Sequence, residues 1–232
     1  MSKFFIPTNT TEDWQSLLAD PDKHWKTGYS AKALAYSWQK ADGFPAEVKE
    51  VFKNSGIDLF QDIQMLLAFP EYKVSLPGGK RVSQNDILIL AKKGAGQLIS
   101  IAVEGKVDEP FGELIADWKL KDKGGKKVRL EFLCEVLQLD VNGIDCIRYQ
   151  LLHRTASALI EARKFNARNA LMLVHAFKKT EENYDQSFRD YCQFLELFGP
   201  EGKSDSIVRG KRIGGINLYF GWVKGNKRYL EK

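Results

Sequence analysis

The sequence predicts an α/β fold of the α+β type, in which helices flank a mixed β-sheet. Three short runs rich in Val, Ile and Leu follow one another between residues 72 and 106, and Gly and Pro separate them, which is typical of a β-meander. Helical patterns dominate before and after these runs, and two further apolar runs, ALMLVHAF and INLYFGWVKG, read as later strands. This order of elements favours one mixed sheet with helices packed on it.

The part of the chain before the meander is expected to be mainly helical. Residues 11–54 carry helical patterns, with Pro45 at a favoured helix-start position and Gly56 ending that helix. A further short helical piece is expected at 58–68, so that the first strand, YKVSL, starts at Tyr72.

The other two strands of the meander form a predicted hairpin. DILILAK begins at Asp86, LISIAVEGK ends at Lys106, and the turn between them lies within Lys92 to Gln97. In an antiparallel hairpin the start of one strand lies beside the end of the next.

Helices are expected to dominate the second half of the chain. Asp108 is a candidate cap for a helix that starts at Glu109 and Pro110 and continues through FGELIADWKLK. KKVRLEFLCEVLQL reads as a second helix, and Asp145 as the cap of a third, CIRYQLLHRTASALIEARKF. A fourth helix, ENYDQSFRDYCQFLELFG, is expected between the two later strands.

We expect a single domain over residues 1–232. It comprises a mainly helical N-terminal part at 1–70, an αβββαβ-type core at 71–178, and a C-terminal helix and strand at 179–232.

Composition limits the classes of function. No apolar run reaches the ~20 residues that a membrane span needs, and the N-terminus lacks the layout of a secretory signal, so a cytoplasmic protein with no membrane partner is expected. Cys134, Cys146 and Cys192 show no CxxC spacing and are expected to be core thiols. The net charge of +5 permits a polyanionic partner without demanding one. The basic residues of VRGKR and VKGNKRYLEK form either a solvated tail or a phosphate-contacting patch.

One pair of charged residues ends an apolar strand. Because side chains alternate along a strand, Glu104 and Lys106 share a face with the small residues Ser100 and Ala102, which leaves room beside them. The predicted hairpin brings Asp86 next to Glu104. Two adjacent carboxylates repel each other, raise one another's pKa and attract a divalent cation. A metal beside a lysine can activate water and neutralise charge at a phosphorus centre, which is the chemistry of phosphodiester hydrolysis.

A simpler interpretation of this pair stays open. The acid-x-Lys tripeptide occurs four more times in the chain, in one case as Glu71 with Lys73. Only Glu104 and Lys106 close an apolar strand that follows another strand starting in Asp. They could still form an ordinary surface ion pair, which would contribute little to stability.

In these residues the sequence resembles the PD-(D/E)XK nuclease superfamily. Asp86 matches the motif aspartate, and Glu104-Gly105-Lys106 match the (D/E)XK element, while Asn85 stands where many members have proline. The phrases GYSAKALAYSWQKADGFP, SQNDILILAK and EGKVDEPFG also look like an uncharacterised bacterial family within that superfamily. The resemblance implies a restriction-endonuclease-like core: a helix, a three-stranded meander, a helix and a further strand.

The resemblance also implies roles for individual residues. Asp86, Glu104 and the Gly105 carbonyl would bind Mg²⁺ or Mn²⁺, and Lys106 would orient or activate the water. Gln150 would join the catalytic residues from the helix beside the active strands.

Further residues are candidates by the same resemblance. Arg148 or Arg154 would meet phosphate, and Glu50, in preference to Glu47, would be an additional acid. Gln150 and Arg154 could instead bond each other on a solvated helix face. Glu109 is a further possible acid, although the helix dipole also explains a glutamate in a first turn.

The leading hypothesis is a metal-dependent nuclease that acts on DNA more readily than on RNA. The alternative is a catalytically inactive nuclease-fold module that binds nucleic acid or a protein partner. A third hypothesis is an assembly protein, for example a homodimer formed through exposed Tyr219, Phe220 and Trp222.

Overall fold

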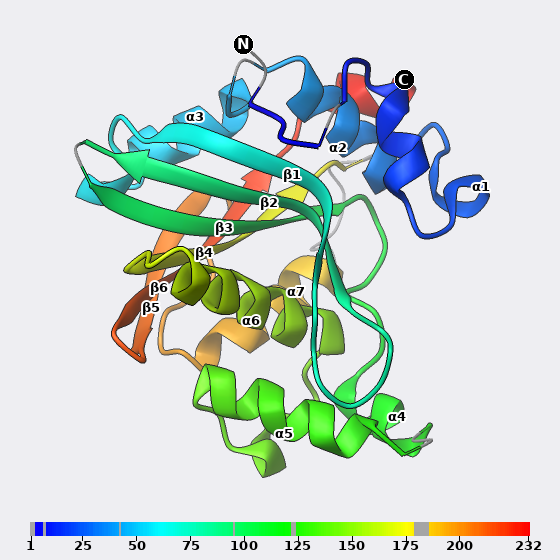
Figure 1. Cartoon of the computed structure of the whole chain (residues 1–232), viewed down its shortest axis with the longest axis vertical. Helices are drawn as coiled ribbons and strands as arrows, with labels where there is room; N and C mark the ends of the chain where they lie inside the picture. The colour runs from blue at the N-terminus through cyan, green and yellow to red at the C-terminus, as the bar shows by residue number, and fades with distance from the viewer. Residues whose placement is uncertain (1–2, 7, 42, 95, 122–123, 179–185) are drawn as a thin grey trace.

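A six-stranded mixed sheet forms the centre of the molecule (Figure 1). The computed structural model describes residues 3–6, 8–41, 43–94, 96–121, 124–178 and 186–232. The strands are β1 (Gln64–Val74), β2 (Ser83–Lys93), β3 (Gln97–Lys106), β4 (Asn169–Ala176), β5 (Ser206–Ile213) and β6 (Ile216–Lys224). Their order across the sheet is β1-β2-β3-β4-β6-β5, in which β3, β4 and β6 are parallel and the other pairs are antiparallel. The predicted α+β class is confirmed.

Helices cover both faces of the sheet (Figure 1). The longest, α6 (Tyr149–Lys164), packs on β2, β3 and β4, and the same side carries α4 (Ile115–Leu120), α5 (Lys126–Leu137) and α7 (Gln186–Glu196). The opposite side carries α2 (Ser30–Gln39) and α3 (Ala46–Asn54). The short elements are η1 (Glu12–Leu17), α1 (Pro21–His24), η2 (Asp58–Phe60), η3 (Val141–Gly143) and η4 (Lys227–Glu231).

Alternation along the strands separates the two cores. Leu88 and Ala102 belong to the core under α6, whereas Ile87 and Ile101 belong to the core under α2 and α3. β4 is buried along its whole length, as expected for a parallel strand with helices on both faces. The strand faces deduced from the sequence are therefore correct.

The first strand is longer than expected. The predicted helical piece at 58–68 is wrong beyond the short η2, because the chain from Gln64 onward pairs with β2. Asp62 has a positive φ of 56°, which turns the chain into the sheet. Met65 and Ala68 are then buried in the core under α2 and α3.

The helix after the meander begins later than expected. α4 starts well after Glu109, so the predicted cap at Asp108 is wrong. Gly112 has a φ of 70°. The backbone next to it lies alongside the first residues of α6, where the Glu113 carbonyl accepts the Tyr149 N–H at 2.9 Å. This segment is held by α6 and does not form a helical turn of its own.

The cap predicted for α6 is also wrong. The Asp145 carboxylate pairs with Lys119 at 2.6 Å, and the N-cap position of α6 is Arg148. Backbone carbonyls of the preceding segment, including that of Glu113, accept the first N–H groups of α6. They satisfy the donors that a capping side chain would otherwise take.

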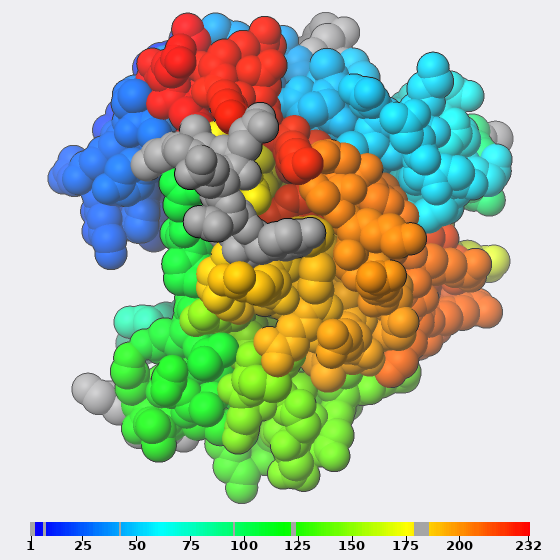
Figure 2. All heavy atoms as spheres, turned by 180° about the vertical axis from the view of Figure 1, so that it is seen from behind, coloured from blue at the N-terminus to red at the C-terminus, as the bar shows by residue number. Residues whose placement is uncertain are grey.

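The C-terminal part contains a strand that the sequence pattern did not indicate. VRGKR lies in β5, an edge strand, so it is not a tail, and Arg209, Lys211 and Arg212 are exposed on that strand. The last turn, η4, packs beside α2 and lies near the N-terminal segment (Figure 2). Tyr219, Phe220 and Trp222 are buried, so they do not form the exposed dimer surface considered above. Of the helix expected at 182–199, residues 186–196 are helical, and 182–185 lie outside the described residues.

The cysteines lie in different environments, and the helices are too short or too polar to span a membrane among the described residues. Cys134 is buried and Cys192 half-buried, but Cys146 is exposed, so it is not a core thiol. Among the helices formed by described residues, none combines the length and apolar character needed to cross a membrane.

The connection between β1 and β2 reaches down to α5 and is fastened there (Figure 1). Arg129 is buried and donates hydrogen bonds to the carbonyls of Pro77, at 2.9 Å, and Arg81, at 2.6 Å. Gly78 has a φ of 79°, and a Cβ there would lie 2.1 Å from the Gly125 carbonyl oxygen. The tip of this connection therefore rests directly on the start of α5.

Replacing Arg129 by Met should release this connection. A hydrogen bond from a charged donor contributes about 1.5–3 kcal/mol, and because Pro77 and Arg81 are exposed residues, water can replace part of what their carbonyls lose. We expect urea unfolding to show a loss of about 2–4 kcal/mol for Arg129→Met. The matched control, Lys127→Met on the exposed side of α5, should change stability by less than about 0.5 kcal/mol. Equal effects of the two substitutions would contradict the role of Arg129.

Candidate functional site

The acidic residues meet where β2 begins and β3 ends. Ile87 pairs with Val103 in the antiparallel ladder, which brings Asp86 beside Glu104. The Asp86 carboxylate accepts the backbone N–H of Gly105 at 2.7 Å. The proximity expected from the hairpin is therefore present in the structure.

Glu104 is buried and surrounded by donors. Only 2% of the residue is exposed, and its carboxylate accepts hydrogen bonds from Arg154 Nε and from Gln150 Nε2, the latter at 2.5 Å. Lys106 Nζ lies 3.0 Å from Glu104 Oε1. The space expected beside the small residues of β3 is filled by these side chains from α6.

Lys106 is held as firmly as Glu104. It is 3% exposed, it donates to Gln150 Oε1 at 2.8 Å, and its ammonium lies 4.8 Å from the centre of the Phe111 ring. Glu104 and Lys106 are thus not the surface ion pair that the sequence left open. Gln150 bonds both of them and does not form a solvated pair with Arg154.

Arg154 bridges the two carboxylates. Its Nε bonds Glu104, while Nη2 lies 3.8 Å from Asp86 Oδ1. Arg154 is buried, whereas the Asp86 side chain keeps 19% of its surface exposed. The guanidinium thus neutralises the charge of Glu104 strongly and the charge of Asp86 weakly.

A third carboxylate, Glu71, stands close to this cluster. Tyr72 of β1 pairs with Asn85 of β2, so Glu71 is the β1 neighbour of Asp86, and it accepts a hydrogen bond from Gln84 at 2.8 Å. Its φ of 51° is unusual for a residue within a strand. The local sequence pattern does not distinguish Glu71 from the acidic residues of the other acid-x-Lys tripeptides. Its place beside Asp86 depends on the length of β1 and on the register between β1 and β2.

The three carboxyl groups differ in their affinity for protons. Burial and the negative charge of Glu104 raise the pKa of Asp86 to about 7. Burial and the charge of Asp86 raise the pKa of Glu71 well above its usual range. Burial also raises the pKa of Glu104, but Arg154 and Lys106 outweigh burial and hold this pKa below its usual value. The mutual repulsion expected from the sequence thus falls on Asp86 and not on Glu104.

Gly105 is enclosed between the site and α2. A Cβ at this position would lie 3.3 Å from Asp86 Oδ2 and 3.3 Å from Leu34 Cδ2. Both distances are tighter than ordinary van der Waals contact, so a larger residue would push the carboxylate or α2 outward. The middle position of the EGK motif therefore favours glycine.

On the other side of the sheet, a buried histidine supports the same strand. His175 pairs with Gly105 across β3 and β4, and its Nδ1 accepts the Trp38 indole N–H at 3.0 Å. Because indole only donates, the imidazole proton is on Nε2, which faces Glu47 Oε1 at 3.3 Å. The His175 contact lowers the pKa of Glu47 to about 2, although burial alone would raise it.

The other predicted site residues lie elsewhere. Glu50 is exposed on α3, which covers the opposite face of the sheet, so it does not join the acidic cluster. Glu109 accepts the Val107 N–H at 3.0 Å and closes the turn after β3. Arg148 pairs with Asp190 of α7 at 2.8 Å, which directs its charge away from Glu104.

The donor set accommodates a divalent cation under one condition. Within the described part of the chain, no three His, Cys, Asp or Glu side chains are arranged to hold a metal ion. Asp86 and Glu104 supply two hard oxygen ligands, and the negative charge of Glu104 contributes, after burial, to the raised pKa of Asp86. Mg²⁺ commonly takes only one or two protein carboxylates and completes its shell from water and substrate. The condition is that Arg154 gives up its place between the carboxylates.

A family model matches almost the whole chain, over residues 7–227. That family is described as a domain of unknown function, DUF6946. The chain belongs to the DUF6946 family. No curated protein and no solved structure matches it. The matched range contains every residue of the acidic cluster in this DUF6946 protein.

The raised pKa of Asp86 predicts how stability depends on pH. Between pH 4 and 7 the folded protein keeps a proton that the unfolded chain has lost, so this group's contribution to stability falls as the pH rises through that window. Asp86→Asn keeps the acceptor for Gly105 and removes the titration. Between pH 4.5 and pH 8 the free energy of unfolding of Asp86→Asn should rise by about 1–4 kcal/mol relative to that of the wild type.

The measurement is urea unfolding across this pH range without divalent cations. Asp117→Asn, an exposed change on α4, should give a profile parallel to that of the wild type. A parallel profile for Asp86→Asn as well would contradict the raised pKa.

Proposed function

We propose that this DUF6946 protein is a metal-dependent nuclease that hydrolyses phosphodiester bonds, in DNA more readily than in RNA. One observation carries the proposal: Asp86, Glu104 and Lys106 converge at the edge of a meander, and Gln150 joins them from α6. The order α3, β1-β2-β3, α6, β4 supports a restriction-endonuclease-like core. A structural ion pair alone would not require Asp86 beside Glu104.

The residues of the chain divide the work of the proposed reaction. Asp86 and Glu104, with the Gly105 carbonyl, would hold Mg²⁺ or Mn²⁺. When bound, such an ion supplies an acidified water and neutralises charge on the phosphate. Asp86 is oriented for this role by the Gly105 N–H, and Glu104 by Gln150.

Lys106 would hold the attacking water. An ammonium group has three donors, and Glu104 and Gln150 are acceptors for two of them among the described residues. The third can donate to a water or to a phosphate oxygen. Phe111 closes the other side of the ammonium group and shields it from solvent.

Arg154 would exchange its carboxylate partner for phosphate. At 3.8 Å its contact with Asp86 is weak, and an arginine can bind a phosphate through two parallel hydrogen bonds. Release of Asp86 by Arg154 would coincide with arrival of the metal and the substrate. The bond to Glu104 would then anchor the guanidinium near the reacting phosphate.

A second function is favoured by a specific observation. Glu104 and Lys106 are almost fully buried, and Arg154, Gln150 and Lys106 already satisfy Glu104 without a metal. This network is sufficient to keep Glu104 buried without a metal. It therefore fits a catalytically inactive nuclease-fold module that binds nucleic acid or a protein partner. Binding that persists in EDTA, with no cleavage under any metal condition, would identify this second function.

Cleavage assays distinguish the two. With Mg²⁺ or Mn²⁺, the wild type should cleave single- or double-stranded DNA, and Asp86→Asn and Glu104→Gln should each lower the rate by about 100-fold or more, because either change removes a metal ligand. Calorimetric titration with Mn²⁺ should show binding to the wild type and its loss in both variants. Glu50→Gln, on the other side of the sheet, should retain the rate within about twofold. Wild-type rates in the Asp86 and Glu104 variants would contradict the proposed function.

A further inference from the structure

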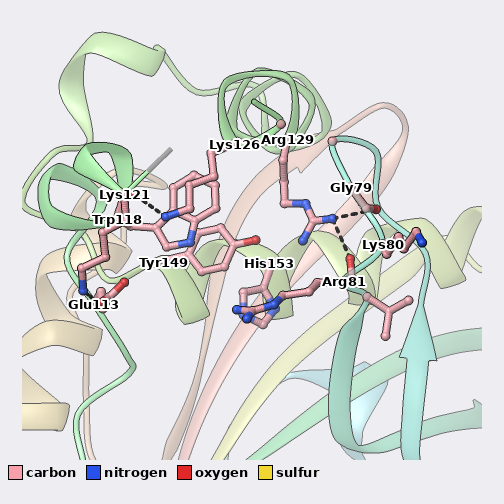
Figure 3. A pocket seen from close by; sticks show the side chains of 13 residues that line it. Gly79, Lys80, Arg81, Glu113, Trp118, Lys121, Lys126, Arg129, Tyr149 and His153 are labelled. Atoms are coloured by element: carbon pink, nitrogen blue, oxygen red, sulfur yellow. Dashed lines mark hydrogen bonds and ion pairs between the residues drawn. The ribbon is translucent and has the colours of Figure 1, made fainter. Parts of the chain in front are cut away.

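A basic hollow lies beside the first turns of α6 (Figure 3). It has a volume of about 720 Å³ and is bounded by the β1–β2 connection, the α4–α5 region and the first turns of α6. Arg129 closes its upper side, and the contact between Gly78 and Gly125 joins two of its walls. The hollow is therefore shaped by packed backbone and by a buried arginine.

The charges that line the hollow are strongly unbalanced. Its cations are Lys80, Arg81, Lys121, Lys126 and Arg129, whereas its one carboxylate among the lining residues is Glu113. Lys121 pairs with Glu113, and Arg129 is used by the β1–β2 connection. Lys80 and Arg81 are exposed, and their side chains form no hydrogen bond or ion pair with other described residues. Their charges are available to an anionic ligand.

The cations lie on opposite walls. Lys80 and Arg81 project from the β1–β2 connection, whereas Lys121 and Lys126 lie across the hollow beside Trp118 (Figure 3). Cations on two facing walls favour a ligand that carries several phosphates, such as a polyanionic strand.

Aromatic rings form the base of the hollow. Trp118 and Tyr149 stack with centroids 4.2 Å apart, Lys126 lies 4.7 Å from the Trp118 ring centre, and His153 lies 4.8 Å from Tyr149. Basic grooves with aromatic side chains are typical of proteins that bind single strands. Because these rings already contact one another, they are less available for stacking with bases than free rings would be, and the cations are left as the main contacts for a strand.

One helix forms a wall of both the hollow and the acidic cluster. Tyr149 and His153 are four residues apart on α6 and line the hollow. Gln150 and Arg154, also four apart, contact Glu104. His153 Nδ1 lies 3.4 Å from Arg154 Nη1, so the two surfaces meet at this pair.

Three cations, Arg154, Arg129 and Lys106, act on His153 at this junction. Burial, together with the charges of Arg154, Arg129 and Lys106, lowers the pKa of His153 well below its usual range. His153 is accordingly neutral at pH 7, and its Nδ1 contacts Ser83 Oγ at 2.7 Å. Repulsion among these cations is what an incoming phosphate would relieve.

We propose that the hollow binds the phosphate backbone of single-stranded nucleic acid and directs it along α6 to Asp86 and Glu104. The proposal rests on the proposed function and specifies its substrate as a single strand. A hollow of this volume falls in the range of small-ligand sites, about 300–1,000 Å³, which suits a few nucleotides of one strand.

Charge reversal at Lys80 and Arg81 tests the proposal. Binding of a fluorescein-labelled single-stranded oligonucleotide is measured by anisotropy in EDTA, so that no cleavage occurs. Lys80→Glu with Arg81→Glu should weaken binding by about tenfold or more and make its salt dependence shallower, since each lost phosphate contact lowers the slope by about 0.7. The control, Lys49→Glu with Lys53→Glu, makes the same charge change on the exposed side of α3 and should bind within about twofold of the wild type.

The outcomes separate this proposal from the nuclease proposal. Equal binding by the two double variants would overturn the role of the hollow, whatever the cleavage assay shows. Competition by inorganic phosphate or by a duplex as effective as that by the single strand would also overturn it. Glu104→Gln that binds the strand normally but does not cleave it would support both proposals. A wild type that cleaves nothing, but whose binding depends on Lys80 and Arg81, would retain the hollow and remove the nuclease.

Discussion

The structure around the site depends on the neutralisation of one buried carboxylate. An ion that leaves water without a partner costs several kcal/mol, so Glu104 can be buried only while cations accompany it. Lys106 comes from the same strand, but Arg154 and Gln150 come from α6. Docking of α6 on β3 is thereby linked to the electrostatics of the motif. Removing Arg154 would affect the sheet–helix contact as well as the charge balance.

The short EGK segment is fixed from both faces of the sheet. On one face α6 supplies the partners of Glu104, and on the other the Trp38–His175 hydrogen bond and the Leu34 side chain support the backbone around Gly105. Asp86 is less constrained, because its carboxylate has a firm bond to Gly105 and only a long contact with Arg154. Asp86 therefore has fewer hydrogen-bond partners than Glu104 among the described residues.

Much of this arrangement follows from local patterns in the sequence. Period-two alternation and the hairpin turn place Asp86, Glu104 and Lys106 on one face, and the structure brings them together there. The start of β1 was missed because QMLLAF shows no alternation, and β5 because charged edge strands resemble loops. The position of Glu71 beside Asp86 depends on the register between β1 and β2. The contact of Arg154 with Glu104 depends on how α6 is rotated about its axis. Both are set by packing between distant segments, which one sequence does not encode locally.

We propose that Asp86 and Glu104 form a cation site that Arg154 occupies when no metal is bound. A crystal structure of the wild type soaked in Mn²⁺ measures this directly through anomalous scattering. We expect an anomalous peak between the two carboxylates, with Arg154 withdrawn from Asp86. Absence of a peak there, with Arg154 still bridging both carboxylates at saturating Mn²⁺, would contradict it.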